Sequence, residues 1–215
     1  MQFIELVNKV LQRLREDTVT ATNDNDYAAL IGDFVNETIR EVEDAWMWSA
    51  NKITIEIPVE NQVFRYSLTS TNQRSQLLSC YNYTDKVRMV KTEPEVMSHW
   101  YFTHNPLQTG SPYYFTRNGI DADGVPIIDL YPIPDGSYTL YCNLKVPRDI
   151  VTDDTDYIDL PPHPIILGAY AKALQERGED MGTNLVHAQK SYELALGDAI
   201  AIDSRITGSQ NDWEV

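Results

Sequence analysis

The chain has 215 residues, a length that fits one large domain or two small ones. Its 17 lysine and arginine residues against 32 aspartate and glutamate residues give a formal net charge of −15 at pH 7. This charge argues against a protein that reads DNA or RNA sequence, because such proteins need a basic surface to neutralise phosphates. It argues equally against a protein held on anionic lipid at a membrane surface. The hydrophobic content of 42% allows an ordinary core.

We expect neither a membrane span nor a secretory signal in this sequence. The longest apolar runs, such as residues 165–167, are far too short to cross a bilayer. The chain does not open with a basic segment followed by an apolar one, so we expect synthesis in the cytoplasm without export. Under those conditions Cys80 and Cys142 are expected to be two buried thiols, although they would suffice for one disulfide.

Two helices are predicted at the start of the chain. Apolar residues recur at helical spacing over residues 3–14, and again over residues 27–46. The intervening residues 23–26 read Asn-Asp-Asn-Asp and contain several candidates for an N-cap. We expect the two helices to form an antiparallel hairpin.

From residue 52 the hydrophobic period changes to two, which predicts strands. The predicted strands cover residues 53–59, 63–68, 76–81, 87–91, 113–117, 126–131 and 138–146. A short helix is predicted from Pro94 to Trp100, with the proline in its first turn. The dipeptides Asn118-Gly119 and Asp135-Gly136 are typical of tight turns and favour an antiparallel β-meander.

The last third of the chain returns to helical periodicity. One helix is predicted to begin near Pro164 and to end at Arg177-Gly178, and a second to run from about residue 184 to about residue 204. Because helices and strands are segregated along the sequence, the predicted class is α+β. The N-terminal helical hairpin and the C-terminal helix pair are expected to form one helix bundle, with an antiparallel β region inserted between them. The expected divisions are residues 1–50, 51–160, 161–204 and a flexible tail, 205–215.

Patterns that would indicate catalysis or metal binding are weak throughout the sequence. The four histidines offer no local pair at a spacing typical of zinc sites, which need three or four converging ligands. Residues 121–124 and 153–156 look like fragments of calcium loops but lack the full alternation of oxygen ligands, so we expect turns there. We therefore expect no enzyme activity, no cofactor, and no catalytic, cofactor-binding or metal-binding residues.

The chain contains 13 tyrosines, many of them in the predicted β region. Tyrosine suits protein–protein contact surfaces because it is rigid and amphipathic. It also has a high β-propensity, so the same tyrosines are compatible with a plain covering of the sheet. Both interpretations stay open from the sequence.

Both helical ends of the chain carry segments that resemble a known family. These are LVNKVLQRLRED (residues 6–17), LIGDFVN (30–36), EVEDAWMW (41–48), LP (160–161) and LGAYAKALQERGED (167–180). They resemble the head-to-tail adaptor proteins, of connector or tail tubular type, of short-tailed bacteriophages. The resemblance covers roughly half of the chain, and the β region matches only in position and length.

The resemblance implies a structural virion protein at the head–tail junction. In such a protein about a dozen copies form a ring beneath the portal protein and offer a platform to the tail nozzle or tail fibre protein. The ring extends the DNA channel, and DNA passes through it without specific binding. The resemblance also implies that the C-terminal tail reaches the portal, which makes Arg205, Trp213 and Val215 candidates for portal binding.

A channel that conducts DNA should repel phosphate rather than bind it, and repulsion acts over only about 8 Å at physiological salt. Acidic side chains on the channel wall would meet this need. The candidates opposite the apolar helix faces are Glu37, Glu41, Asp44, Glu176, Glu179 and Asp180. The alternative is that these residues form an ordinary solvated face.

Two other functions stay open from the sequence. One is a different tail-completion or fibre-attachment protein that works as a monomer or trimer. The other is a small acidic binding module, or a hydrolase whose site residues are scattered along the chain.

Overall fold

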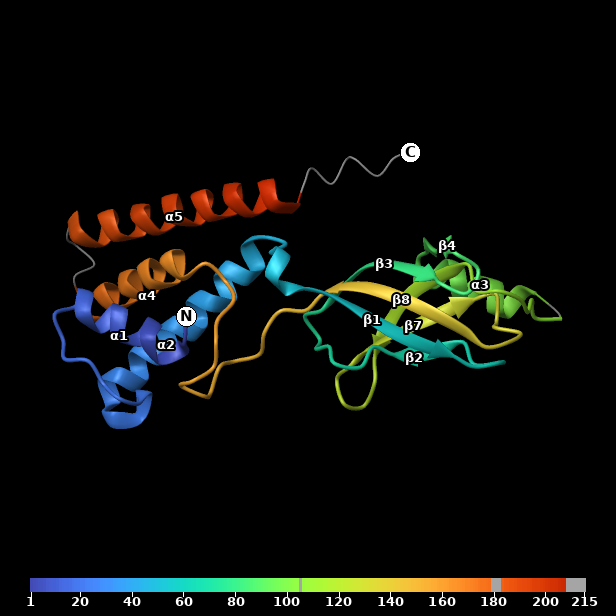
Figure 1. Cartoon of the computed structure of the whole chain (residues 1–215), viewed down its shortest axis with the longest axis horizontal. Coiled ribbons are helices and arrows are strands. Elements are labelled where there is room, and N and C mark those ends of the chain that lie inside the picture. The colour runs from blue at the N-terminus through green and yellow to red at the C-terminus, as the bar shows by residue number, and fades with distance from the viewer. Residues whose placement is uncertain (105, 179–182, 208–215) are drawn as a thin grey trace. The chain divides into compact units, whose positions relative to one another are not determined.

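The computed structural model describes residues 1–104, 106–178 and 183–207. The chain forms two compact units (Figure 1). The helical unit comprises Met1–Ala50 and Arg148–Val215, and the β unit comprises Asn51–Pro147. Both ends of the chain therefore contribute to one helical unit, and the β unit is inserted between them. The predicted α+β class is confirmed.

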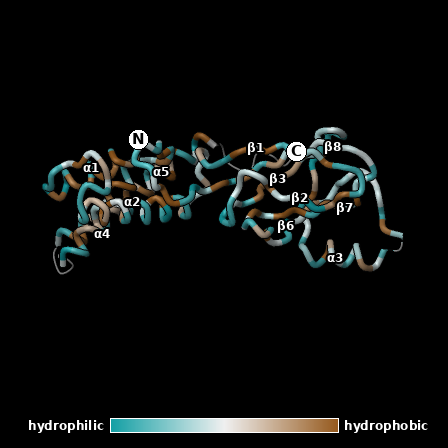
Figure 2. Tube along the Cα trace, turned by 90° about the horizontal axis from the view of Figure 1, so that it is seen from below, coloured by the Kyte–Doolittle hydropathy of each residue, from teal (hydrophilic) through white to brown (hydrophobic). Residues whose placement is uncertain are grey.

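The described residues of the helical unit form four α-helices close to the predicted positions: α1 (Phe3–Arg13), α2 (Asp26–Ala45), α4 (Pro162–Glu176) and α5 (Thr183–Thr207). Short 3-10 helices lie before α2 (η1, Thr22–Asp24) and after it (η2, Ser49–Asn51). Hydrophobic and hydrophilic residues alternate along these helices (Figure 2), and α1, α2 and α4 each bury one row of apolar residues in a shared core. Helix α5 runs alongside α4 (Figure 1).

The helix boundaries follow from local chemistry. The side chain of Asn25 accepts a hydrogen bond of 2.7 Å from the backbone N–H of Ala28, which caps α2. Helix α4 opens on prolines, whose missing N–H groups cost nothing in a first turn. It ends before Gly178, which adopts a φ of +76°, a conformation that favours glycine.

A return segment, residues 148–160, belongs to the helical unit, whereas the sequence predicts it to be part of the β region, 51–160. Its backbone bonds to the start of α1, since the N–H of Phe3 donates to the carbonyl of Asp156 at 2.9 Å. The side chain of Asn36 pairs with both the N–H and the carbonyl of Val151, each at 3.0 Å. The carboxylate of Asp154 accepts from the N–H and the hydroxyl of Thr22. These bonds hold the segment against α1 and α2 without regular secondary structure.

Gly168 allows α4 to approach α2 and α5 closely. A Cβ atom added at Gly168 would lie 2.5 Å from Cγ2 of Thr38 and 3.1 Å from Cε2 of Tyr192. Thr38 is fully buried on α2, and its hydroxyl donates to the carbonyl of Phe34 at 2.7 Å. The centre of the helical core therefore has no room for a methyl group at this position.

The β unit consists of two four-stranded sheets, ordered β1-β8-β3-β4 and β2-β7-β6-β5. The strands are β1 (Lys52–Val59), β2 (Arg65–Ser67), β3 (Gln76–Asn82), β4 (Val87–Arg88), β5 (Val90–Lys91), β6 (Tyr114–Ile120), β7 (Pro126–Tyr131) and β8 (Tyr138–Lys145). The described part also contains α3 (Pro94–Thr103). Apolar side chains of both sheets share one core. All strand pairs are antiparallel except β5 with β6, which is parallel.

The predicted β-meander is wrong beyond its first pair: β6 and β7 are antiparallel neighbours, but the next strand does not continue their sheet. Strands β7 and β8 follow one another in the chain but lie in different sheets. The predicted turn at Asn118-Gly119 is also wrong, since both residues lie within β6 at an irregularity of its pairing with β7. The turn instead follows at Asp121, whose carboxylate accepts from the N–H groups of Asp123 and Val125.

The expectation of two buried thiols is wrong as well. Cys80 on β3 and Cys142 on β8 face each other in register and are joined as a disulfide, fully buried in the core of the β unit. In the other sheet, the buried Asp129 of β7 accepts two hydrogen bonds from the guanidinium of Arg65, at 2.7 and 2.8 Å, and one from Asn118. A buried carboxylate needs such partners to offset the loss of water.

Substitution of Gly168 tests how tightly the helical core is packed. We expect Gly168→Ala to destabilise the helical unit by about 1–2 kcal/mol, because overpacking outweighs the gain in helix propensity. Gly197→Ala on α5 is the matched control, since nothing lies within 4 Å of its added Cβ, and it should be neutral or slightly stabilising. Urea unfolding followed by far-UV circular dichroism measures both. Adding Thr38→Ser should recover part of the loss, and equal stability of the two glycine variants would contradict the close contact.

Candidate assembly surfaces

The acidic charge of the protein is concentrated in one of its two units. The helical unit carries 23 acidic and nine basic residues, a formal charge of −14, whereas the β unit carries nine acidic and eight basic residues, a charge of −1. The net charge of the whole chain does not show this division. The division becomes visible only when the two ends of the chain and the return segment are counted together as one unit.

Two of the predicted channel-facing residues form an ion cluster on the helical unit. Glu37 and Glu41 stand one turn apart on α2, and each carboxylate lies 2.8 Å from the ammonium group of Lys172 on α4. Burial of this amine would lower its pKa, but the hydrogen bonds that it donates to the two carboxylates outweigh burial and raise the pKa above its ordinary value. The cluster therefore holds α2 to α4, and its net charge is reduced by the lysine.

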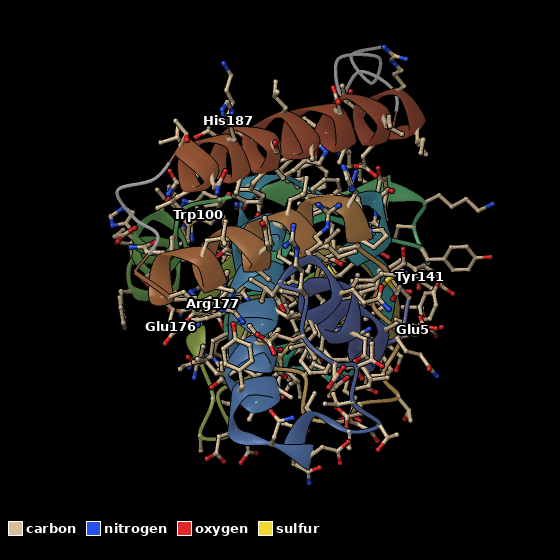
Figure 3. All side chains as sticks on the ribbon, turned by 90° about the vertical axis from the view of Figure 1, so that its left-hand side faces the viewer. Glu5, Trp100, Tyr141, Glu176, Arg177 and His187 are labelled. Carbon is tan, nitrogen blue, oxygen red and sulfur yellow. A yellow bond between two sulfur atoms is a disulfide. The ribbon has the colours of Figure 1, made fainter. Side chains whose placement is uncertain are left out.

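The other four acidic candidates do not belong to this ion cluster. Glu176 is exposed at the end of α4, where Figure 3 shows it beside Arg177. Asp44 is exposed near the end of α2. Glu179 and Asp180 lie outside the described residues. The structure thus brings Glu37 and Glu41 together and leaves Asp44 and Glu176 as exposed acids elsewhere on the same unit.

Arg177 joins the ends of the helices. Its guanidinium donates to the carboxylate of Glu16 at 2.5 Å and to the hydroxyl of Tyr27 at 2.8 Å, and it lies over the Tyr27 ring. Such a contact fixes the end of α4 against the connection between α1 and α2.

The candidates for portal binding fall at the end of the chain. Arg205 is exposed in the last turn of α5, where a positive charge favours the helix dipole. Trp213 and Val215 lie outside the described residues. Helix α5 extends to Thr207, so the first residues of the predicted tail are helical.

An apolar groove lies in the helical unit between α5 and the start of α4. We call it the α5 groove; it has a volume of about 550 Å³. Its lining includes Trp48, Pro161, Leu167, Leu194, Ile202 and Ile206, with the carboxylates of Asp159, Asp198 and Asp203. The side chains of Leu194, Ile202 and Ile206 are 63%, 60% and 71% exposed and recur at multiples of four residues, so they form one stripe along α5. The periodicity of the sequence placed α5 correctly but did not show that this stripe lies beside a groove.

Asp203 fixes one side of the α5 groove. Its carboxylate is buried and accepts hydrogen bonds from the indole N–H of Trp46, at 3.0 Å, and from the hydroxyl and backbone N–H of Ser49. These bonds tie the last third of α5 to the end of α2. The exposed stripe is therefore fixed in position, because hydrogen bonds of Asp203, on the same helix, attach α5 to the end of α2.

Aromatic side chains in the β unit are divided between core and surface. Trp100 on α3 packs against Tyr114 and Tyr131 with ring centroids 4.9 and 5.0 Å apart, and the hydroxyl of the buried Tyr131 lies 2.7 Å from Nδ1 of His104. By contrast, Tyr83 and Phe102 are largely exposed. The tyrosines thus serve packing in part, and they also leave apolar surface in the β unit.

The four histidines and the two aspartate-rich segments lie at surface and turn positions. All four histidines are exposed, His187 among them on α5 (Figure 3). Within the described residues, no group of three or more His, Cys, Asp or Glu side chains could hold a metal ion. Residues 121–124 and 153–156 form the expected turns, in which Asp121 and Asp153 accept hydrogen bonds from backbone N–H groups. The pKa of Asp121 is lowered by its hydrogen bond with the side chain of Ser67 and by backbone N–H groups, and the pKa of Asp153 is lowered by the backbone N–H and hydroxyl of Thr155. Among the described helices, none combines the length and apolar composition needed to cross a membrane.

The ion cluster makes a prediction about alkaline stability. The pKa of Lys172 is higher in the folded chain than in the unfolded one, so its stabilisation is complete below about pH 10.4 and is lost as the pH rises through the folded value. We expect Lys172→Gln to cost about 1 kcal/mol at pH 8, because the partners are half exposed, and less near pH 11. Urea unfolding at both pH values measures the difference. Lys190→Gln, at an exposed position of α5, is the control, and a penalty that is equal at both pH values would argue against the cluster.

Comparison with known proteins identifies the family. A family model described as SU10 adaptor protein matches residues 1–212. No curated protein matches the chain. The family match spans the helical segments at both ends and the whole β unit, which the resemblance in the helices alone did not cover. The chain therefore belongs to the SU10 adaptor protein family, a family of structural proteins of bacteriophages.

Proposed function

We propose that this phage adaptor forms a ring of about twelve copies between the portal protein and the tail nozzle or tail fibre protein, and that the ring extends the DNA channel. The protein would be made in the host cytoplasm and act at the head–tail junction of the virion by binding alone, with no bond made or broken. The observation that carries the proposal is the charge of −14 on the helical unit.

A DNA channel imposes an electrostatic requirement that this division of charge would meet. Phosphates are attracted to basic walls, and binding along the path would slow the passage of the genome. Because salt screens repulsion beyond about 8 Å, the acidic charge must lie on the wall itself. We infer that the helical unit lines the channel with α1, α2, α4 and α5, and that the nearly neutral β unit serves contacts with other proteins.

Among the acidic candidates, Glu37, Glu41, Asp44 and Glu176 are all exposed on the helical unit. Lys172 neutralises part of the charge of Glu37 and Glu41, so these two contribute less to the field of the wall than two isolated carboxylates would. Glu179 and Asp180 adjoin Glu176 in the sequence and would add to the same acidic end. The proposed wall therefore depends on the summed field of the unit rather than on one residue.

The copy number on the portal tests the proposed function directly. Purified adaptor is added to portal-containing particles that lack it, and the bound mass is measured by native mass spectrometry of the released portal complex. We expect about twelve copies per portal in a closed ring. One or three copies would instead indicate a fibre-attachment or tail-completion protein, and no binding would refute the adaptor role for the isolated chain.

The tail, residues 205–215, is proposed to anchor the ring to the portal through Trp213. We expect Trp213→Ala to weaken attachment by up to about 2 kcal/mol, or roughly 30-fold, because buried aromatic anchors dominate such contacts. Phe102→Ala removes an exposed aromatic ring in the β unit and is the matched control. Titration of portal particles with each labelled variant gives the affinities. Equal affinities for wild type and Trp213→Ala would remove this role from the tail.

A further inference from the structure

We propose that the α5 groove of one copy binds residues 86–91 of a second copy, and that this contact joins neighbours in the assembly. The inference rests on the proposed ring and names the surfaces that would build it. Residues 86–91 are here called the basic strand segment; they read Lys-Val-Arg-Met-Val-Lys and include β4 and β5.

The α5 groove is an apolar surface with acidic surroundings. The stripe of Leu194, Ile202 and Ile206 leaves more than half of each side chain exposed, which costs solubility unless a partner covers it. Asp198 is exposed on the same face of α5, one turn from Leu194 and one turn from Ile202. Asp159 also lines the groove and lies 3.6 Å from Arg148. A partner for this surface must therefore be apolar at its centre and basic around it.

The basic strand segment has this chemistry. Val87 and Val90 are 36% and 42% exposed, and the exposed cations Lys86, Arg88 and Lys91 are interspersed with them. Three of the eight basic residues of the β unit thus fall within six positions. The segment crosses between two sheet edges, because β4 ends one sheet and β5 ends the other.

Met89 gives the basic strand segment a fixed shape. Its side chain is 4% exposed in the core of the β unit, and its N–H donates to the carbonyl of Cys80 at 3.0 Å. The valines and cations on either side are thereby held at the surface by a buried anchor. A pre-shaped segment loses less conformational freedom on binding than a mobile loop.

The division of charge favours a contact between unlike units. Two helical units of charge −14 repel each other, whereas the β unit is nearly neutral and its basic strand segment is positive. A contact between two different surfaces of the same chain is heterologous, and such contacts close into rings when the rotation permits. A standard interface buries about 800 Å² on each partner, so the groove would be the apolar centre of a wider contact.

Charge exchange tests this contact. The groove variant combines Ser191→Arg with Asp198→Arg, and the segment variant combines Arg88→Glu with Lys91→Glu. Gln189→Arg with Glu193→Arg is the matched control, because it makes the same change in charge on α5 at exposed positions outside the groove. Copies bound per portal are counted by native mass spectrometry, and circular dichroism shows that each variant is folded.

We expect the groove variant alone, and the segment variant alone, to form complete rings on at most about a tenth as many portals as wild type, since like charges then face each other at every contact. An equal mixture of the two variants should restore closed rings that contain both in a one-to-one ratio, because every contact again pairs opposite charges. The control variant should assemble as wild type does.

Rings formed by either variant alone at the wild-type level would overturn the inference and leave the proposed ring intact. Loss of assembly that the mixture does not restore would also overturn it, and would assign the α5 groove to a different protein. Failure of wild type to form a ring would instead refute the proposed function, so the two failures are distinguishable.

Discussion

The pairing of β1 with β8 is the constraint on which the two-unit structure depends. Lys52 pairs with Lys145, and the N–H of Val146 donates to the carbonyl of Asn51 at 2.8 Å, so the two ends of the inserted β unit meet. Without this closure, the entropy of a long loop would oppose the packing of α1 and α2 against α4 and α5. The helical core is assembled from the two ends of the chain, and its tight centre at Gly168 needs both ends in place.

Local sequence signals predicted the elements well because their causes are local. The apolar spacing of α1, α2, α4 and α5 and the caps at Asn25 and Gly178 all act within a few residues. The same holds for the turns at Asp121 and Asp153, where the side chain binds the backbone that follows it. Each of these features can be predicted without knowing what the segment packs against.

Features that depend on distant residues were missed. The order of the two sheets is set by side chains that share a core rather than by turn dipeptides, and the dipeptide Asn118-Gly119 predicts a turn where the structure has a strand, β6. The disulfide of Cys80 with Cys142 requires knowledge of the register between β3 and β8. The ion cluster at Lys172 and the α5 groove arise only when α4 packs on α2 and α5.

The division of charge connects the fold to the proposed role. Insertion of a nearly neutral β unit into a strongly acidic helical unit gives one chain two surfaces with different chemistry. An acidic wall repels DNA but also repels other copies of itself, so an assembly of this protein needs contacts that offset the repulsion. The α5 groove and the basic strand segment would supply such a contact, while the acidic face stays available to the channel.

A reconstruction of the portal–tail junction in the virion that carries this adaptor tests the central claim most directly. The account predicts density for a closed ring of this chain beneath the portal, with the helical unit on the wall of the bore and the β unit away from it. Absence of the chain from that junction, or a bore lined by the β unit, would contradict the account.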